Sequence, residues 1–154
     1  MTQPAVEKFL ASVAVLGLAP EVREFDESTH TAAEAAAAIG CDVAAIVKSL
    51  LFEADGEPLL VLASGPNRVD TAGLGAKLGV TIGKADADAV KRSTGYSIGA
   101  VPPLGHLAPL RTIFDETLLE LPVVWAAAGS ATAVFAIDPA ELARLTNAEI
   151  SSIS

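Results

Sequence analysis

The chain contains few of the residues on which several common kinds of protein chemistry depend. It has one cysteine, Cys41, and two histidines, His30 and His106, among its 154 residues. One cysteine excludes an intrachain disulfide, and neither histidine has a second ligand at metal-binding spacing. We therefore expect no disulfide and no metal site, and we interpret Cys41 as a small core residue near a helix end.

Positive charge is also scarce. Ten lysines and arginines stand against 19 aspartates and glutamates, which gives a formal charge of −9. Broad, nonspecific nucleic-acid binding depends on neutralising phosphates with Lys and Arg, so this balance argues against a DNA-binding protein. The stretch 68–92 is the exception, since it holds five cations and three aspartates, a net of +2. These cations form either one basic face or ordinary solvated helix surface.

Long apolar runs and the common nucleotide-binding and hydrolase motifs are missing. No stretch reaches the roughly 20 apolar residues that span a bilayer. Glu7 and Lys8 interrupt the first apolar stretch, which argues against a signal peptide. No P-loop, dinucleotide fingerprint or G-x-S-x-G motif occurs. We expect a soluble cytoplasmic protein without a cofactor or a membrane partner.

What the chain does have is enough apolar sequence for a core, because 51% of its residues are hydrophobic. We find no repeat and no linker, so we expect one compact mixed α/β domain over residues 1–154, with a sheet of five to seven strands surrounded by helices. Helices are predicted over 6–16, 31–40, 70–79 and 86–94 and after the N-cap Asp138, and strands over 22–25, 46–53, 58–63, 110–114, 123–127 and 132–137.

The second predicted strand contains the most informative residue of the chain. Strand alternation places Lys48 on the same side as the apolar residues Ile46, Leu50 and Phe52. The lysine stem either covers apolar surface while its ammonium reaches water, or the ammonium meets an anion or a polarised carbonyl in a pocket. Asp55-Gly56 follows, which indicates a hairpin with a longer turn. Lys48 would then lie near the start of its strand.

A second candidate feature is the irregular segment 95–106. It places three glycines around the pair Pro102-Pro103, which predicts a rigid, shaped loop. Glycine lets a ligand approach the backbone closely, while proline limits the freedom of the loop. The segment is either part of a binding site or a plain connection between elements.

The order of these features resembles the YbaK/EbsC family of aminoacyl-tRNA deacylases, which includes the editing domain of bacterial prolyl-tRNA synthetases. The resemblance rests on His30-Thr31 before an Ala/Glu helix, the run 46–50, the Gly- and Pro-containing loop at 95–103, Gly129-Ser130 and the terminal helix that begins at Pro139. It covers nearly the whole chain. It implies a YbaK-like fold with a mixed or barrel-like sheet.

The resemblance implies a freestanding trans-editing hydrolase that cleaves the ester of a mischarged tRNA, typically tRNA for proline carrying a small amino acid such as Cys or Ala. It assigns catalysis to Lys48, without a metal, and prolyl-tRNA synthetase becomes a candidate partner alongside the tRNA acceptor end. The substrate-binding positions that it suggests are His30, Ser49, Gly99, Pro102 and Ser130.

One departure bears on specificity. Some alanine-specific relatives carry a histidine after the Gly-Ser pair, whereas this chain reads Ser130-Ala-Thr-Ala, so the sequence does not choose among cysteine, alanine and serine. Two rival functions stay open from the residues alone. One is a noncatalytic binding module for an amino-acid-like ligand or a synthetase, and the other is an enzyme that forms a Schiff base through Lys48.

Overall fold

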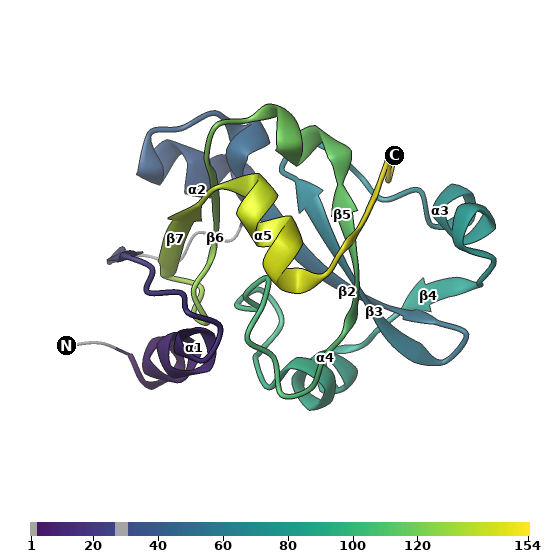
Figure 1. Ribbon diagram of the computed structural model, residues 1–154, viewed down its shortest axis with the longest axis horizontal. Coiled ribbons are helices and arrows are strands. Elements are labelled where there is room, and N and C mark those ends of the chain that lie inside the picture. The colour runs from purple at the N-terminus through teal and green to yellow at the C-terminus, as the bar shows by residue number, and fades with distance from the viewer. Residues whose placement is uncertain (1–2, 27–30) are drawn as a thin grey trace.

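Helices and strands are interspersed along the chain (Figure 1). A computed structural model describes residues 3–26 and 31–154, and no helix in these ranges is long and apolar enough to cross a membrane. The helices are α1 (Pro4–Ala14), α2 (Ala32–Ile39), η1 (Val43–Ala45), α3 (Thr71–Leu78), α4 (Ala87–Thr94), η2 (Glu116–Glu120) and α5 (Pro139–Thr146), where η marks a 3-10 helix. The strands are β1 (Val22–Glu24), β2 (Val47–Ala54), β3 (Glu57–Ser64), β4 (Ile82–Lys84), β5 (Arg111–Asp115), β6 (Val124–Ala127), β7 (Ala133–Ile137) and β8 (Glu149–Ser151).

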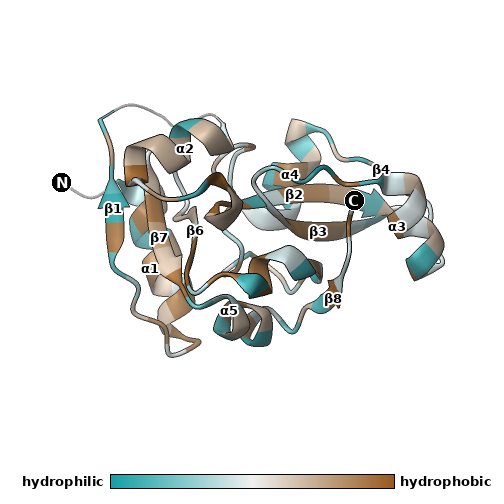
Figure 2. Cartoon of the chain, turned by 90° about the horizontal axis from the view of Figure 1, so that it is seen from above, coloured by the Kyte–Doolittle hydropathy of each residue, from teal (hydrophilic) through white to brown (hydrophobic). Residues whose placement is uncertain are grey.

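These strands form two sheets. Their orders are β1-β7-β6 and β4-β2-β3-β5-β8, and a single parallel bridge between Ile46 and Trp125 links the two. Helices α1 and α2 lie beside the three-stranded sheet, α3 lies at the opposite end, and α4 and α5 lie between (Figures 1 and 2). The predicted mixed α/β class is confirmed, although the strands divide between two sheets where we expected one.

The helix boundaries follow the predicted capping residues. Thr31 Oγ1 accepts a hydrogen bond from the Glu34 amide at 3.1 Å, and Gly40 ends α2 with a left-handed φ of 87°. Asp138 accepts from the Ala140 amide at 3.1 Å, so it caps α5 as expected. Such caps satisfy amides and carbonyls that the helix itself leaves unpaired.

The hairpin of β2 and β3 is tighter than the sequence suggested. Ala54 pairs with Glu57, so the turn is only Asp55-Gly56, and both residues have positive φ, 51° and 87°. This is the type I′ geometry that Asp-Gly favours. The prediction of a longer turn was wrong because Pro58 does pair within the strand. It lies opposite Glu53 at a position that needs no amide hydrogen bond, so its missing N–H costs nothing.

One hydrophobic cluster contains residues from both sheets. Phe9 of α1, Phe114 of β5 and Phe135 of β7 are fully buried in it, and the rings of Phe9 and Phe135 lie 5.0 Å apart. The other face of β2 and β3 forms a second cluster, in which Leu59 and Val61 are fully buried. β3 is accordingly among the most hydrophobic segments in Figure 2.

The sequence patterns did not predict strands β4 and β8. β4 and β8 are three residues long, lie at the edges of the larger sheet, and are mostly exposed. A short exposed edge strand carries no apolar run or alternation that a sequence pattern could detect. Both strands are held by pairing with a longer neighbour.

Candidate active site

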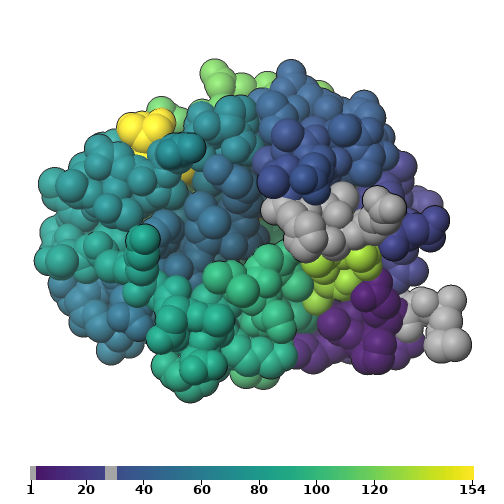
Figure 3. All heavy atoms as spheres, turned by 180° about the vertical axis from the view of Figure 1, so that it is seen from behind, coloured from purple at the N-terminus to yellow at the C-terminus, as the bar shows by residue number. Residues whose placement is uncertain are grey.

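A cavity of about 640 Å³ lies between the two sheets. β2 forms one wall, β6 and β7 form the opposite wall, and residues of α2 and of the irregular segment 95–109 complete the rim. Figure 3 shows this face, with β2 in blue between α2 and the green segment that precedes β5. Most of the lining is apolar, and the wall from β6 and β7 combines Trp125 with smaller side chains: Ala126, Ala127, Ala133 and Val134.

The first half of β2 presents an open backbone edge to this cavity. β4 pairs with β2 only at Phe52, Glu53 and Ala54, so within the described ranges no strand covers residues 48–51 on that side. The two-residue turn fixes which amides bond β3, because hydrogen-bonded pairs alternate along an antiparallel ladder. The main-chain groups of Ser49 and Leu51 therefore face away from β3. They are available to a ligand that lies along the strand.

Lys48 occupies the predicted place near the start of β2. Its Nζ donates a 2.6 Å hydrogen bond to the main-chain carbonyl of Asn67, in the loop after β3. The alternation is confirmed, since Leu50 and Phe52 pack with the β3 residues of the second cluster while Val47 belongs to the first. The lysine is half-buried and lines the cavity.

The surroundings of Lys48 lower the pKa of its side chain. Burial lowers the pKa of the ammonium, the positive charge of Arg68 lowers it further, and the negative charge of Asp115 acts in the opposite direction. A desolvated ammonium has fewer water partners, so its N–H groups are stronger donors to a ligand.

The loop that accepts the Lys48 hydrogen bond is tied to β5. Asn67 Nδ2 donates to Asp115 Oδ2 at 2.8 Å and to Thr117 Oγ1 at 3.1 Å. No sequence pattern predicted a role for Asn67 or Asp115. The available signal was weak, because a polar residue directly after an apolar run also marks an ordinary strand end.

The other sequence-predicted positions are only partly brought together. Ser49, Gly99 and Ser130 line the cavity with Lys48, and Gly99 has a left-handed φ of 84°. Ser49 Oγ is buried and has no hydrogen-bond partner among the described residues. Ser130 Oγ donates to Gln3 Oε1 at 2.8 Å and accepts from the Thr132 amide at 3.1 Å, so it also shapes the turn between β6 and β7.

Two predicted positions lie elsewhere. Pro102 is buried behind the lining, where its carbonyl accepts from His106 Nε2 at 2.7 Å. Burial lowers the pKa of this imidazole, which is consistent with a neutral ring that stabilises the loop. His30 falls outside the described residues.

The basic stretch does not act as one unit. Lys84 lines the cavity and Arg68 lies close enough to Lys48 to affect its pKa, and both side chains are exposed. Lys77, by contrast, donates to the Ser152 carbonyl at 3.1 Å beside the C-terminal segment. Part of the predicted basic character therefore borders the cavity.

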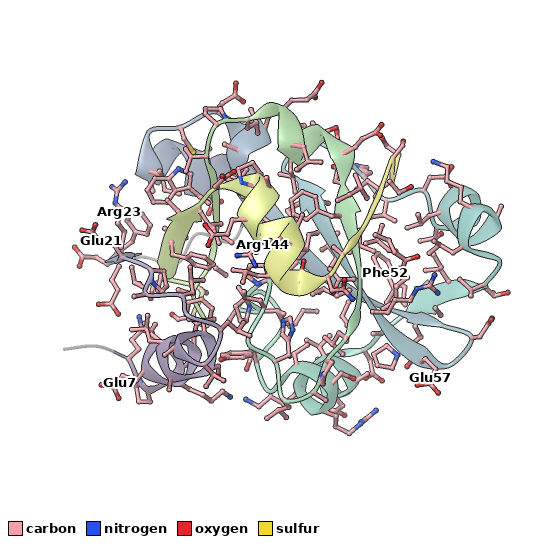
Figure 4. The ribbon with its side chains drawn as sticks, in the orientation of Figure 1. Glu7, Glu21, Arg23, Phe52, Glu57 and Arg144 are labelled. Atoms are coloured by element: carbon pink, nitrogen blue, oxygen red, sulfur yellow. The ribbon has the colours of Figure 1, made fainter. Side chains whose placement is uncertain are left out.

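The single tryptophan is stacked at the cavity wall. Trp125 lines the cavity, and the guanidinium of Arg23 lies 5.6 Å from the centre of its ring. Figure 4 labels Arg23 at the outer end of the molecule, near β1. A cation over an aromatic face stabilises the ring in place.

The polar groups of the cavity are thus the ammonium groups of Lys48 and Lys84, hydroxyls and main-chain groups, in largely apolar surroundings. Among its described lining residues there is no carboxylate and no imidazole. No group of three or more His, Cys, Asp or Glu side chains comes together as metal ligands in residues 3–26 and 31–154. The arrangement can bind and polarise a carbonyl or another electron-rich group.

Comparison with known proteins supplies a family. A family described as "Aminoacyl-tRNA editing domain" matches residues 26–145. A crystal structure of a protein with a proposed trans-editing role for prolyl-tRNA synthetase superimposes with a TM-score of 0.95 at 38% identity, covering 100% of this chain and 99% of that one.

Two relatives differ in how much of their length this chain covers. The uncharacterized protein YwhH from Bacillus subtilis (strain 168) is 28% identical over 84% of this chain and 83% of its own length. Proline–tRNA ligase from Nitratidesulfovibrio vulgaris (strain DP4) is 34% identical over 62% of this chain but only 17% of the ligase. The similarity to the ligase thus concerns one part of a much larger enzyme.

Proposed function

Because the chain belongs to the aminoacyl-tRNA editing domain family, we propose that it is a hydrolase that cleaves the ester bond of a mischarged tRNA. The trans-editing protein is matched over 99% of its length, which supports action in trans rather than as part of a synthetase. The ligase relative supports tRNA for proline as the substrate and prolyl-tRNA synthetase as a partner. We also propose that the protein acts in the cytoplasm, where mischarged tRNA would otherwise enter translation.

The observation that carries this proposal is the position of Lys48. Its ammonium lies in the wall of a largely apolar cavity, with one N–H held by the Asn67 carbonyl. An ammonium has three N–H donors, so two remain for a ligand. We propose that they bind the ester carbonyl and stabilise the negative charge that develops on its oxygen as water attacks.

The reaction needs no covalent intermediate. A water oxygen bonds to the carbonyl carbon, and the bond from that carbon to the ribose oxygen breaks. The water proton goes to a substrate group or solvent and ultimately to the departing ribose hydroxyl, while Lys48 keeps its own proton. We propose that no metal takes part, since Lys48 supplies the electrostatic stabilisation.

The remaining cavity groups are proposed to hold the substrate. Main-chain groups of Ser49 and Leu51 on the open edge of β2, with the backbone of Gly99, would bind the aminoacyl group or the terminal adenosine. Ser130 is proposed as a polar contact at the rim, and Lys84 as a contact for a phosphate. We propose a small amino acid such as Cys or Ala as the aminoacyl group, in a space bounded by Trp125 and the small side chains of β6 and β7.

The test is release of amino acid from tRNA for proline charged with Cys, Ala, Ser or Pro, measured with purified protein in the presence and absence of a chelator. We expect release from at least one mischarged species, unaffected by the chelator and lost in Lys48→Ala. Lys77→Ala, which removes a lysine outside the cavity, is the matched control and keeps full activity. Folded protein that releases nothing from any species would instead support a noncatalytic binding module.

A further inference from the structure

A buried carboxylate connects the frame of the larger sheet to the loop that holds Lys48. Asp115 ends β5 and is 1% exposed. Its Oδ2 accepts from the Ser64 amide at 3.0 Å and from Asn67 Nδ2 at 2.8 Å. Its Oδ1 accepts from the Thr117 amide at 3.0 Å, which caps η2. One carboxylate oxygen therefore holds Ser64 and Asn67, the first and last residues of the turn that follows β3.

Asn67 is the link between that carboxylate and the cavity. Its side chain donates to Asp115 and Thr117, its amide donates to the Ser64 carbonyl at 2.9 Å, and its own carbonyl accepts from Lys48 Nζ at 2.6 Å. The hydrogen bonds made by the Asn67 side chain and amide therefore hold its carbonyl in position. A lysine side chain has four flexible bonds, and this carbonyl fixes where its end lies.

Capping alone does not account for the arrangement. An Asp at the end of a strand needs only one oxygen to cap a following turn, as Asp138 does for α5. In Asp115 the second oxygen accepts from Ser64, the last residue of β3, and from Asn67, whose carbonyl holds Lys48. One oxygen of Asp115 therefore caps η2, and the other holds Ser64 and Asn67.

We propose that Asp115 and Asn67 are positioning residues for Lys48, which set the location of its ammonium without touching the substrate. This inference rests on the proposed function, in which Lys48 stabilises the developing charge. Displacement of a catalytic group by about 1 Å costs about 10²-fold in rate, so a loosened loop should lower kcat. Substrate binding by the rest of the cavity should change little.

The two residues should differ in their effect on pH dependence. The charged groups that act on Lys48 are Arg68, from the loop after β3, and Asp115, from the end of β5. The negative charge of Asp115 raises the pKa of Lys48, so its removal lowers that pKa. Catalysis needs the ammonium, and activity is lost as pH rises through the pKa. Loss of the carboxylate therefore moves the alkaline limb to lower pH, whereas loss of the Asn67 side chain leaves it in place.

The experiment compares Asn67→Ala, Asp115→Asn and the matched control Asp55→Asn. Asn67→Ala removes Nδ2 but keeps the carbonyl that Lys48 uses. Asp55→Asn removes the same charge at the far end of the hairpin, in a turn position that Asn favours, and it keeps an oxygen for the Thr81 amide. Folding is checked by circular dichroism, and kcat, KM and the pH profile are measured on the mischarged tRNA that the wild type hydrolyses.

We expect kcat to fall about 10-fold to 100-fold in Asn67→Ala and Asp115→Asn, with KM within about threefold of the wild type. The alkaline limb should move only in Asp115→Asn, and Asp55→Asn should change neither quantity. Folded Asn67→Ala with wild-type kcat would overturn the proposal. If Asp115→Asn does not fold, Asn67→Ala and Thr117→Val, which removes one acceptor of Asn67, decide the matter.

A readout without turnover separates this inference from the proposed function. The pKa and mobility of the Lys48 side chain can be followed by NMR of lysine labelled with ¹³C at Cε. If the wild type hydrolyses no tRNA, a lower Lys48 pKa in Asp115→Asn and a more mobile side chain in Asn67→Ala still support positioning. Unchanged signals in both variants contradict it.

Discussion

The two sheets contribute different things to the cavity between them. The five-stranded sheet provides Lys48 and the hydrogen bonds that fix it, through Asn67 and Asp115. The three-stranded sheet provides a wall of mostly small side chains and a turn at Gly129-Ser130. In the proposed function, the first wall carries the catalytic group and the second bounds the aminoacyl group. Substitutions in the wall from β6 and β7 can therefore change which substrate fits, while Lys48 and its hydrogen bonds stay the same.

The largest expected effect tests whether the two walls share one core. Phe135 of β7 is fully buried in the cluster that also contains Phe114 of β5. We expect Phe135→Ala to lower the free energy of unfolding by about 3–5 kcal/mol, in a single transition that removes both sheets together. Urea unfolding followed by circular dichroism and by Trp125 fluorescence measures this. Val15→Ala, at an 86% exposed position, is the control. Two separate transitions would show that the sheets are independent.

A smaller effect is expected at the turn of the three-stranded sheet. Gly129 has a φ of 97°, and an added Cβ would lie 2.7 Å from the Ala5 carbonyl oxygen. Gly129→Ala therefore combines backbone strain with a clash, and we expect a loss of about 2–3 kcal/mol. Gly99→Ala is the matched control, because Gly99 has a similar φ but nothing within 4 Å. Thermal unfolding of both variants should rank them in this order, and equal losses would mean that the contact with Ala5 does not matter.

A larger side chain in the wall from β6 and β7 tests whether that wall selects the substrate. Ala127 of β6 lines the cavity and is partly exposed. We expect Ala127→Leu to lower kcat/KM about 10-fold or more for the larger of two accepted aminoacyl groups relative to the smaller, because added bulk excludes part of the substrate. Competition between two mischarged tRNAs measures the ratio. A uniform loss for both substrates would assign Ala127 to folding rather than to selection.

The smallest effect concerns an ion pair between β5 and β8, whose residues do not line the cavity. Arg111 of β5 contacts Glu149 of β8 at 2.7 Å, and both side chains are close to half exposed. The hydrogen bond from Arg111 lowers the pKa of Glu149, so the pair stabilises the fold above the unfolded pKa of the carboxyl and loses that effect as pH falls through the folded value. Because water screens the pair, Glu149→Gln should cost less than about 1 kcal/mol.

The same variant should leave deacylation unchanged. Unfolding in urea at neutral and acidic pH gives the difference between wild type and variant, which should shrink at acidic pH. A change in kcat would contradict the view that the outer edge of the larger sheet has only a structural role.

The sequence indicated the first wall far better than the contacts behind it. Lys48 stands out because a charged residue interrupts a strand pattern, and its strand, hairpin and neighbouring helices were found at nearly their observed places. Asn67 and Asp115 were missed because their roles come from a contact between residues 48 positions apart. No local pattern reports such a contact.

The second wall was predicted only in part. Alanines in an apolar strand look the same whether they face a core or a cavity, so Ala127 and Ala133 gave no signal. Pro102 was expected in the binding site because of its loop, but the loop turns it inward against His106. The division into two sheets was also missed, since strand order depends on long-range pairing rather than on the pattern of any one strand.

One measurement tests the comparison most directly: kcat and KM of Lys48→Met and Ala127→Leu on the same mischarged tRNA. Methionine keeps an unbranched apolar stem but removes the charge. We predict that Lys48→Met lowers kcat about 10²-fold to 10³-fold with KM within a few-fold of the wild type, and that Ala127→Leu mainly raises KM. Wild-type kcat in folded Lys48→Met would contradict the account.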